Sequence, residues 1–203
     1  MPRVITPLTI ADFRNRLCEA ASELLVERGM NGFNMRELAK RLHVSPMTAY
    51  RYFEDKDEIL GHIRARGFAR LADVLTVARL QSDAAGVLRA YVRFALEDPV
   101  TYRLMFDLFQ TENSEAAELA LHCERVRAAM NDVAAGPEDA PREIRGAVLW
   151  SALHGVMALY LAGKLNRPQF EQALTAAARL HAGVEVGPAA SGWPLHAALT
   201  AAE

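Results

Sequence analysis

Residues 35–60 read MRELAKRLHVSPMTAYRYFEDKDEIL, and this stretch predicts two short helices around a tight turn. Asn34 is suited to cap the first helix, and Glu37, three residues later, matches the acidic position of a capping box. Ser45 is suited to cap the second helix, because Pro46 then occupies the first helical position, where its missing N–H costs nothing. Two short helices joined in this way form a helix-turn-helix unit.

The second helix of this unit is too short to be stable alone, so it depends on its neighbours. Ala49 and Phe53 are the apolar residues expected to hold it against the first helix. Asp55 and Glu58 match a further capping box, which begins a longer helix.

The exposed face of the second helix is rich in hydroxyl groups and includes an arginine, unlike an ordinary helix surface with Glu and Lys. It carries Met47, Thr48, Tyr50, Arg51 and Tyr52. Hydroxyl and guanidinium groups reach phosphates and base edges in the major groove of DNA, which admits a helix. The alternative is an ordinary helix surface on which the aromatic residues are incidental. Tyr52 is also a candidate for partial packing in the core.

From Phe13 to about Gly67 the sequence resembles the TetR family of bacterial transcriptional regulators, most clearly in the run from Tyr50 through Phe53 to Lys56. The resemblance implies that Arg36 reaches the groove, that residues 46–48 face bases, and that the tyrosines and the lysine face phosphates. The implied DNA-contacting set is Arg36, Ser45, Pro46, Met47, Thr48, Tyr50, Arg51, Tyr52 and Lys56. His43 departs from the family pattern, which usually has Gly there for a left-handed backbone, but His tolerates that conformation better than most residues.

Helical periodicity continues through the chain without strand alternation, so the predicted fold is all-α. A helix from Thr9 to Gly29 completes a three-helix headpiece, giving a helix-turn-helix domain over residues 9–56. A long helix from Lys56 to about Ala78 then connects it directly to a helical ligand-binding and dimerisation domain over residues 57–184. Residues 185–203 are expected to form an irregular tail.

Composition excludes few classes, since 51% of the 203 residues are hydrophobic, 24% are charged and the net charge is −2. Residues 1–70 carry +3 and the remainder −5, which is compatible with DNA binding by the N-terminal part. We find no motif for catalysis, a nucleotide cofactor or a metal, and we expect no enzyme activity, no catalytic residues, no cofactor and no metal. Two distant cysteines and no visible signal peptide favour a cytoplasmic protein.

Aromatic and methionine side chains recur through the C-terminal part, together with one histidine in an apolar helix. A small-molecule inducer cavity between helices is lined by such side chains. The candidates are Tyr91, Phe94, Met105, Phe106, Phe109, Trp150, His154 and Met157. Ordinary core packing is the alternative for each of them.

Residues 147–162 are apolar except for Ser151, His154 and Gly155, a run that we judge too short for a membrane span. A helix that is apolar on all sides must be covered on several sides, so we expect a second subunit to cover one of them. With the next helix it predicts a four-helix dimer interface through Leu149, Leu153, Val156, Tyr160, Phe170, Leu174 and Ala177. The TetR resemblance implies the same arrangement, and the Trp150…His154-Gly155 pattern resembles one C-terminal subgroup of that family.

The sequence therefore predicts a ligand-responsive transcriptional repressor that binds a palindromic DNA operator as a homodimer, with no membrane partner. Two alternatives stay open. One is a helical module that binds a small molecule or a partner protein without binding DNA. The other is an enzyme that uses the C-terminal cavity, with His154 as a base.

Overall fold

A computed structural model of the chain describes residues 7–106, 116–137, 140–184 and 186. In these ranges the regular structure is α-helical throughout, which confirms the all-α prediction. Phe109 and all of the predicted tail except Val186 lie outside the described residues.

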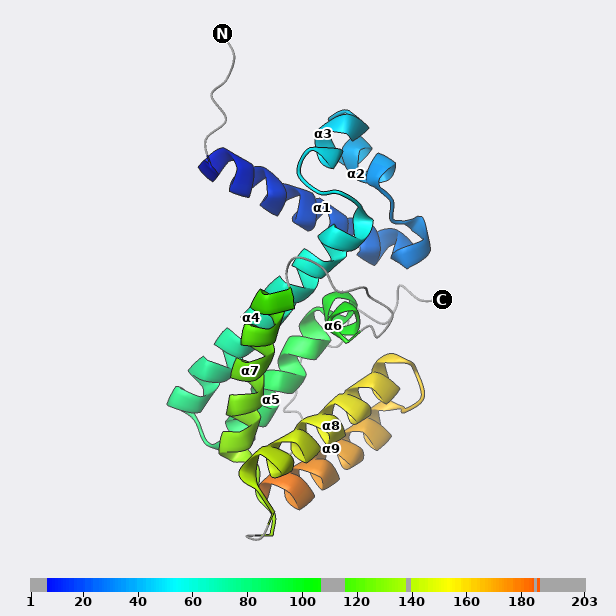
Figure 1. Ribbon diagram of the computed structural model, residues 1–203. Coiled ribbons are helices and arrows are strands. Elements are labelled where there is room, and N and C mark those ends of the chain that lie inside the picture. Colours follow the sequence, from blue (N-terminus) through cyan, green and yellow to red (C-terminus); the bar gives the residue numbers. More distant parts are fainter. Residues whose placement is uncertain (1–6, 107–115, 138–139, 185, 187–203) are drawn as a thin grey trace.

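The N-terminal unit consists of α1 (Pro7–Gly32), α2 (Met35–Arg41), α3 (Pro46–Tyr50) and the start of α4 (Lys56–Gln81). Helix α1 begins two residues before the expected start at Thr9 and is interrupted at Gly29, where φ is 66°. Figure 1 shows α2 and α3 at the end of the molecule farthest from α8 and α9. One apolar cluster holds this unit together, and it includes Leu17, Leu38, Ala49, Phe53 and Ile63.

The helix starts follow the capping residues predicted from the sequence, but the acidic partners differ. Asn34 accepts hydrogen bonds from two backbone N–H groups of α2, and Ser45 accepts one from α3. The Glu37 carboxylate accepts a 2.7 Å hydrogen bond from Arg28, where a capping box would have it accept from the Asn34 backbone N–H. Glu58 accepts from the Glu54 N–H, so its carboxylate reaches one residue before the cap. The capping boxes were therefore predicted correctly at their first positions only.

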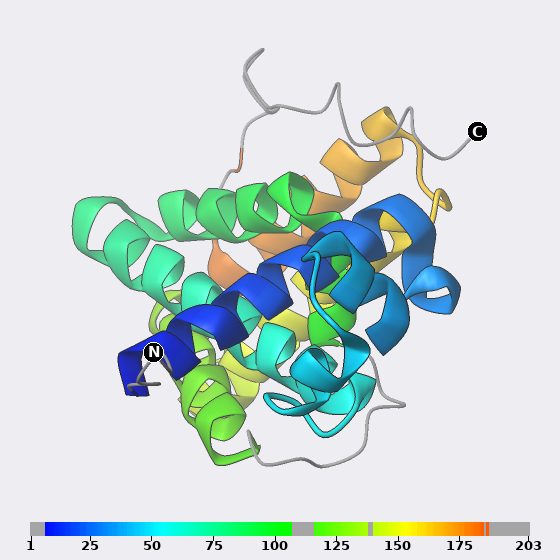
Figure 2. The same ribbon diagram turned by 90° about the horizontal axis from the view of Figure 1, so that it is seen from above.

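The C-terminal unit contains α5 (Ala84–Glu97), α6 (Pro99–Met105), α7 (Ala116–Val133), α8 (Arg142–Leu161) and α9 (Arg167–Ala182). Helix α7 lies along α4, and α8 and α9 form an antiparallel pair beside them (Figure 1). Seen from above in Figure 2, α1 crosses over the C-terminal helices, with α2 and α3 to one side of it.

Helix α4 belongs to both units. Ile63 is in the N-terminal apolar cluster, whereas Phe68 is in the C-terminal cluster, so the apolar core divides between these two residues. Gly67 lies at this division, where a Cβ atom would come within 2.8 Å of the Met105 Cγ and Sδ atoms. A glycine here therefore lets α6 cross close to α4.

Helix α8 places its predicted interface residues on the wrong side for a dimer. Leu149, Leu153 and Tyr160 are buried within the chain's own core, as are the three predicted residues of α9 (Phe170, Leu174 and Ala177), and Val156 is half-buried. Side chains that are already covered by their own subunit present no surface to a second one. The residue-level interface prediction was wrong at these six positions, because an apolar run does not reveal which side of a helix meets its own core.

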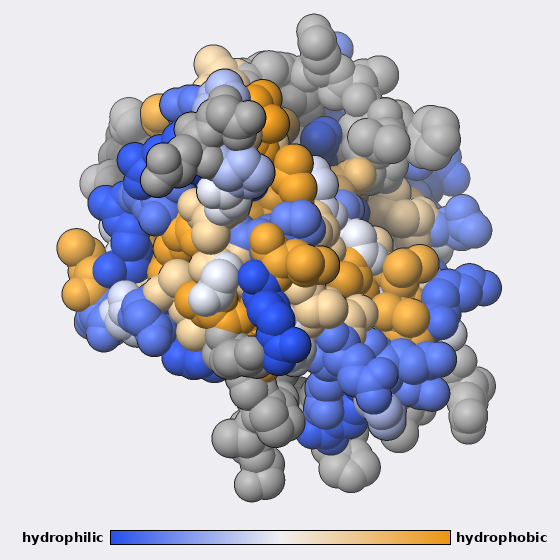
Figure 3. Space-filling view, turned by 90° about the horizontal axis from the view of Figure 1, so that it is seen from below, coloured by the Kyte–Doolittle hydropathy of each residue, from blue (hydrophilic) through white to orange (hydrophobic). Residues whose placement is uncertain are grey.

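The exposed side of α8 runs opposite these buried residues. We call the residues Val148, Ser151, Ala152, Gly155 and Leu159 the outer stripe of α8. Val148 is 45% exposed and Leu159 is 48% exposed, and Leu180 on α9 is 72% exposed. Figure 3 looks onto the end of the molecule opposite α3, where apolar residues gather near the middle and hydrophilic residues lie mostly around the edge.

Helix α8 has 20 residues and is long and apolar enough to cross a membrane, and one third of its most apolar 18-residue stretch is buried in the chain. The judgement that this segment is too short was therefore incorrect. Such a helix is weak evidence for a membrane span, because the core helices of soluble proteins can have the same length and apolar composition.

Candidate functional site

Helix α3 presents a sharply divided surface. Ala49 is fully buried and Phe53, just after the helix, is 1% exposed, so both anchor it to the N-terminal core. On the other side Met47 is 71% exposed and Tyr50 is 49% exposed, and Arg51 is exposed beside them. The exposed side chains have the length and the hydrogen-bonding groups needed to reach base edges and phosphates.

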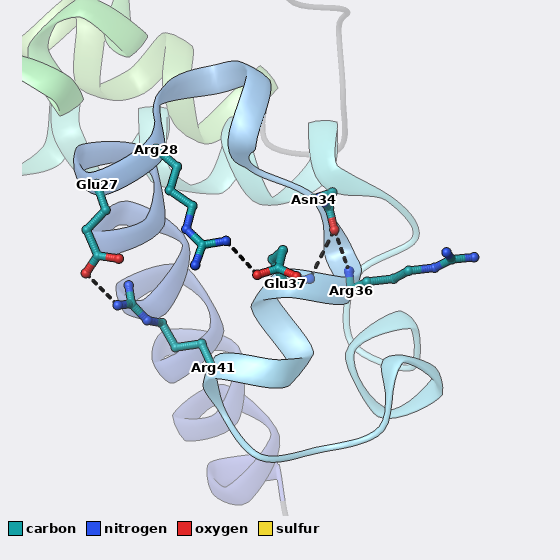
Figure 4. A network of polar contacts seen from close by, with 6 residues as sticks. All are labelled: Glu27, Arg28, Asn34, Arg36, Glu37 and Arg41. Carbon is teal, nitrogen blue, oxygen red and sulfur yellow. Dashed lines mark hydrogen bonds and ion pairs between the residues drawn. The ribbon is translucent and has the colours of Figure 1, made fainter.

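Two sets of basic side chains in the N-terminal unit differ in their partners. Arg28 and Arg41 pair with Glu37 and Glu27 and so stabilise the packing of α1 against α2. Figure 4 shows this network, with the Arg36 side chain extending away from it. Among the residues that the structure describes, the side-chain charges of Arg36, Arg51 and Lys56 have no recorded acidic partner. These three residues form the second set, and their charges remain available to bind an anion.

Thr48 and Tyr52 are only half-buried, and each also has a structural contact. The Thr48 hydroxyl lies 2.9 Å from the Ser45 hydroxyl at the start of α3. The Tyr52 ring packs on Phe13 with centroids 4.6 Å apart, and its carbonyl oxygen accepts a 2.6 Å hydrogen bond from Arg14. Tyr52 is thus partly a core residue, as its alternative interpretation allowed.

The turn between α2 and α3 has the backbone that the sequence predicts. His43 has φ of 55°, in the left-handed region that glycine adopts most easily. Its N–H donates to the Lys40 carbonyl, and the Val44 N–H donates to the Ala39 carbonyl. The turn is therefore closed by hydrogen bonds in spite of the unusual residue.

A chain of polar groups crosses the interior of the C-terminal unit. The Trp150 Nε1–H donates to the Tyr91 hydroxyl at 3.2 Å, and the Tyr91 and Tyr102 hydroxyls lie 2.7 Å apart. The Tyr102 hydroxyl lies 2.8 Å from His154 Nδ1. We call these four residues the polar chain. It joins the consecutive helices α5 and α6 to α8, and the contact between Tyr102 and His154 spans 52 residues of the chain.

Aromatic rings surround the exposed end of this polar chain. The Phe106 ring lies on the His154 ring, with centroids 4.0 Å apart. Phe68 contacts both Phe106 and Trp150 edge-on, at 5.4 and 6.5 Å. Burial raises the pKa of Tyr91 and of Tyr102, so both hydroxyls keep their protons, and burial lowers the pKa of His154.

The predicted ligand residues only partly come together. Tyr91, Trp150 and His154 belong to the polar chain, and the Phe106 ring packs against it. Met105 and Met157 are buried in the same apolar cluster as Tyr91. Phe94 lies under the Arg70 guanidinium, 5.6 Å from its ring centroid. An open groove of about 560 Å³ lies between α4 and α5 in the described part of the chain, and none of the seven described candidates lines it.

Comparison with known proteins matches both units. The family model for bacterial regulatory proteins of the tetR family matches residues 17–63, which run from the middle of α1 through α2 and α3 to the beginning of α4. The model for the tetracyclin repressor-like C-terminal domain matches residues 84–183. The chain belongs to the TetR family. It is therefore a DNA-binding transcriptional regulator and not an enzyme, as the sequence predicted.

Individual TetR-family relatives are distant. The chain is 32% identical over 126 residues to FasR, an HTH-type transcriptional activator of Mycolicibacterium smegmatis, covering 59% of this chain and 58% of that protein. Among solved structures, the regulatory protein SCO4313 has a TM-score of 0.68 at 25% identity, covering 87% of this chain and 98% of that one. Thermus thermophilus FadR, a TetR family repressor solved with lauroyl-CoA, has a TM-score of 0.55 at 19% identity, with 82% and 91% covered.

Two features of this TetR-family chain were not predicted from its sequence. Tyr102 links Tyr91 to His154, and the only available signal was that a buried tyrosine hydroxyl needs a hydrogen-bonding partner. The outer stripe of α8 was not recognised either, although its small residues at positions 151, 152 and 155 follow helical spacing.

Proposed function

We propose that the chain is a ligand-responsive repressor that binds a two-fold symmetric DNA operator as a homodimer. The proposal rests on the divided surface of α3. Its Ala49 side chain is buried in the N-terminal core, whereas Met47, Tyr50 and Arg51 are exposed. In a dimer, two such helices enter successive major grooves about 34 Å apart. Met47, Thr48 and Arg36 discriminate bases, while Tyr50, Tyr52 and Lys56 hold phosphates. The protein then acts in the cytoplasm, where the operator DNA is accessible to it.

The dimer forms through the exposed sides of α8 and α9. The outer stripe of α8 supports this assignment, because it combines the exposed apolar Val148 and Leu159 with small residues between them. A Cβ atom added at Gly155 meets no atom within 4 Å in the single chain, so this position leaves room for another helix to approach. A second copy, and not a membrane, is thus the proposed cover of the exposed side of α8.

Ligand response requires a connection between the two units, and α6 supports one. Its Leu104 belongs to the N-terminal apolar cluster, whereas Tyr102 and Met105 belong to the C-terminal cluster. A ligand bound near the polar chain displaces α6, and α4 tilts with it, so the headpieces lose the half-site spacing. The ligand acts only through different affinities for the two dimer states.

Repression is the proposed direction because a dimer on a promoter excludes RNA polymerase by occupancy alone. FasR, named an activator, is a partial relative. A promoter–reporter fusion therefore decides the direction: reporter activity rises on deletion of the gene if the chain represses, and falls if it activates.

Replacing Lys56 with alanine is expected to weaken binding to all DNA sequences alike. Lys56 is exposed at the start of α4 and carries one positive charge. Loss of one phosphate contact lowers the slope of log affinity against log salt concentration by about 0.9. The measurement is a salt series of fluorescence anisotropy with operator DNA and with random DNA.

Lys164→Ala is the matched control, since it removes the same charge from the turn between α8 and α9. Its salt slope should equal that of the unmodified protein. An unchanged slope for Lys56→Ala would remove Lys56 from the phosphate contacts.

A further inference from the structure

The hydrogen bonds of the polar chain have a direction that follows from the chemistry of its first member. An indole N–H can only donate, so the Tyr91 oxygen accepts from Trp150. Tyr91 is fully buried, and its own hydrogen then has one recorded acceptor among the described residues, the Tyr102 oxygen at 2.7 Å. Tyr91 therefore donates to Tyr102.

The same reasoning fixes the tautomer of His154. Tyr102 accepts from Tyr91, so its hydrogen goes to its other partner, His154 Nδ1 at 2.8 Å. A nitrogen that accepts a hydrogen bond carries no proton, and a neutral imidazole then carries its proton on Nε2. His154 Nε2–H is thus a donor at the open end of the polar chain.

The polar chain also keeps His154 neutral. Protonation at Nδ1 would require the Tyr102 hydroxyl to turn toward Tyr91 and the Tyr91 hydrogen to turn toward Trp150, which cannot accept it. A buried hydroxyl hydrogen would then lack an acceptor, which is unfavourable. Burial lowers the pKa of His154 in the same direction.

The surroundings of His154 are apolar where they meet the ring. Phe106 lies on its face, and Tyr102 lies beside it with centroids 5.6 Å apart. Phe68 and Trp150 extend this aromatic wall. The ring is half-buried, and its Nε2 has no recorded hydrogen-bond partner in the described part of the chain. A half-buried donor without a partner, beside an aromatic wall, is suited to an oxygen acceptor on an apolar molecule.

We propose that the effector of this regulator is an uncharged, largely apolar small molecule whose carbonyl or ether oxygen accepts a hydrogen bond from His154 Nε2–H. The proposal rests on the proposed ligand response and adds the chemical class of the ligand. A carboxylate at this position would favour the imidazolium, which the direction of the polar chain opposes.

The first test reads the tautomer in the free, full-length protein. With ¹⁵N-labelled histidine, NMR should show His154 with its proton on Nε2 and a pKa below the ordinary histidine value. Tyr102→Phe should release Nδ1, so that His154 titrates at higher pH than in the unmodified protein. Tyr160→Phe, the same change on α8 outside the polar chain, should leave His154 unaltered. A proton on Nδ1 in the unmodified protein would overturn the proposal.

The second test uses three probes of one shape: 2-acetonaphthone, 2-naphthoate and 2-ethylnaphthalene. The ketone should shift the His154 Nε2–H signal and bind about fivefold to tenfold more tightly than either of the others, as expected for one hydrogen bond to a neutral donor. His154→Leu should remove the preference of the ketone over the hydrocarbon. Tighter binding of the carboxylate, equal binding of ketone and hydrocarbon, or no binding of the ketone would each overturn the proposal. Because no DNA is present, these outcomes leave the operator-binding proposal to be judged separately.

Discussion

Replacing Leu159 with glutamate is expected to convert the protein to monomers and to lower operator affinity by about 100-fold or more. Leu159 is 48% exposed on the outer stripe of α8, so the single chain tolerates the charge there. At a two-fold interface the charge appears twice and loses its hydration, at a cost of several kcal/mol. A loss of 2.8 kcal/mol corresponds to about 100-fold.

Sedimentation equilibrium measures this directly, because a monomer has a mass of 22.4 kDa and a dimer twice that. Leu121→Glu is the matched control, because Leu121 is 60% exposed on α7, outside the proposed interface. The Leu121→Glu protein should remain dimeric. A Leu159→Glu protein that sediments as a dimer would exclude this face of α8 as the interface. A charge at Leu174 is not a suitable test, since that residue is 5% exposed and lies in the core.

Replacing Gly146 with alanine is expected to destabilise the folded chain by about 1–3 kcal/mol, the usual range for overpacking. A Cβ atom here would come within 2.8 Å of the Asn131 Cα and backbone N atoms. The contact involves the α7 backbone, which cannot move aside like a flexible side chain. The two helices must therefore separate, with loss of the packing around Met130 and Leu149. Urea unfolding followed by circular dichroism gives the free energy of unfolding.

Gly155→Ala on the same helix is the control for this change. No atom lies within 4 Å of its added Cβ, so alanine should raise the free energy of unfolding by up to about 1 kcal/mol through helix propensity. Both variants should be compared in the Leu159→Glu background, so that dimer contacts do not contribute. Equal stability of the two alanine variants would contradict the close α7–α8 approach.

Local signals in the sequence were sufficient for the N-terminal unit. Asn34, Ser45 and Asp55 cap the helices as predicted, because a cap depends on residues within one turn of it. His43 has the left-handed backbone that the resemblance to the TetR family implied for this position. The partners of Glu37 and Glu58 were not predictable in this way, since Arg28 and Arg14 come from α1.

The C-terminal unit depends on contacts between distant residues, and there the sequence was less informative. The hydroxyls of Tyr91 and Tyr102 and the ring of His154 meet through contacts 11 and 52 residues apart in the chain. The buried side of α8 was assigned incorrectly because its sequence is apolar on nearly every side. Periodicity identifies a helix, but it does not identify which neighbour each side will meet.

The central claim is that the exposed face of α3 reads DNA sequence as part of a two-fold symmetric dimer. Enrichment of bound molecules from a random-sequence DNA library, using the purified full-length protein, tests it most directly. The account predicts an inverted repeat with half-site centres about one helical turn apart, and Thr48→Ala should change the preferred bases within each half-site. Enrichment of no sequence, or of a single unrepeated half-site, would contradict it.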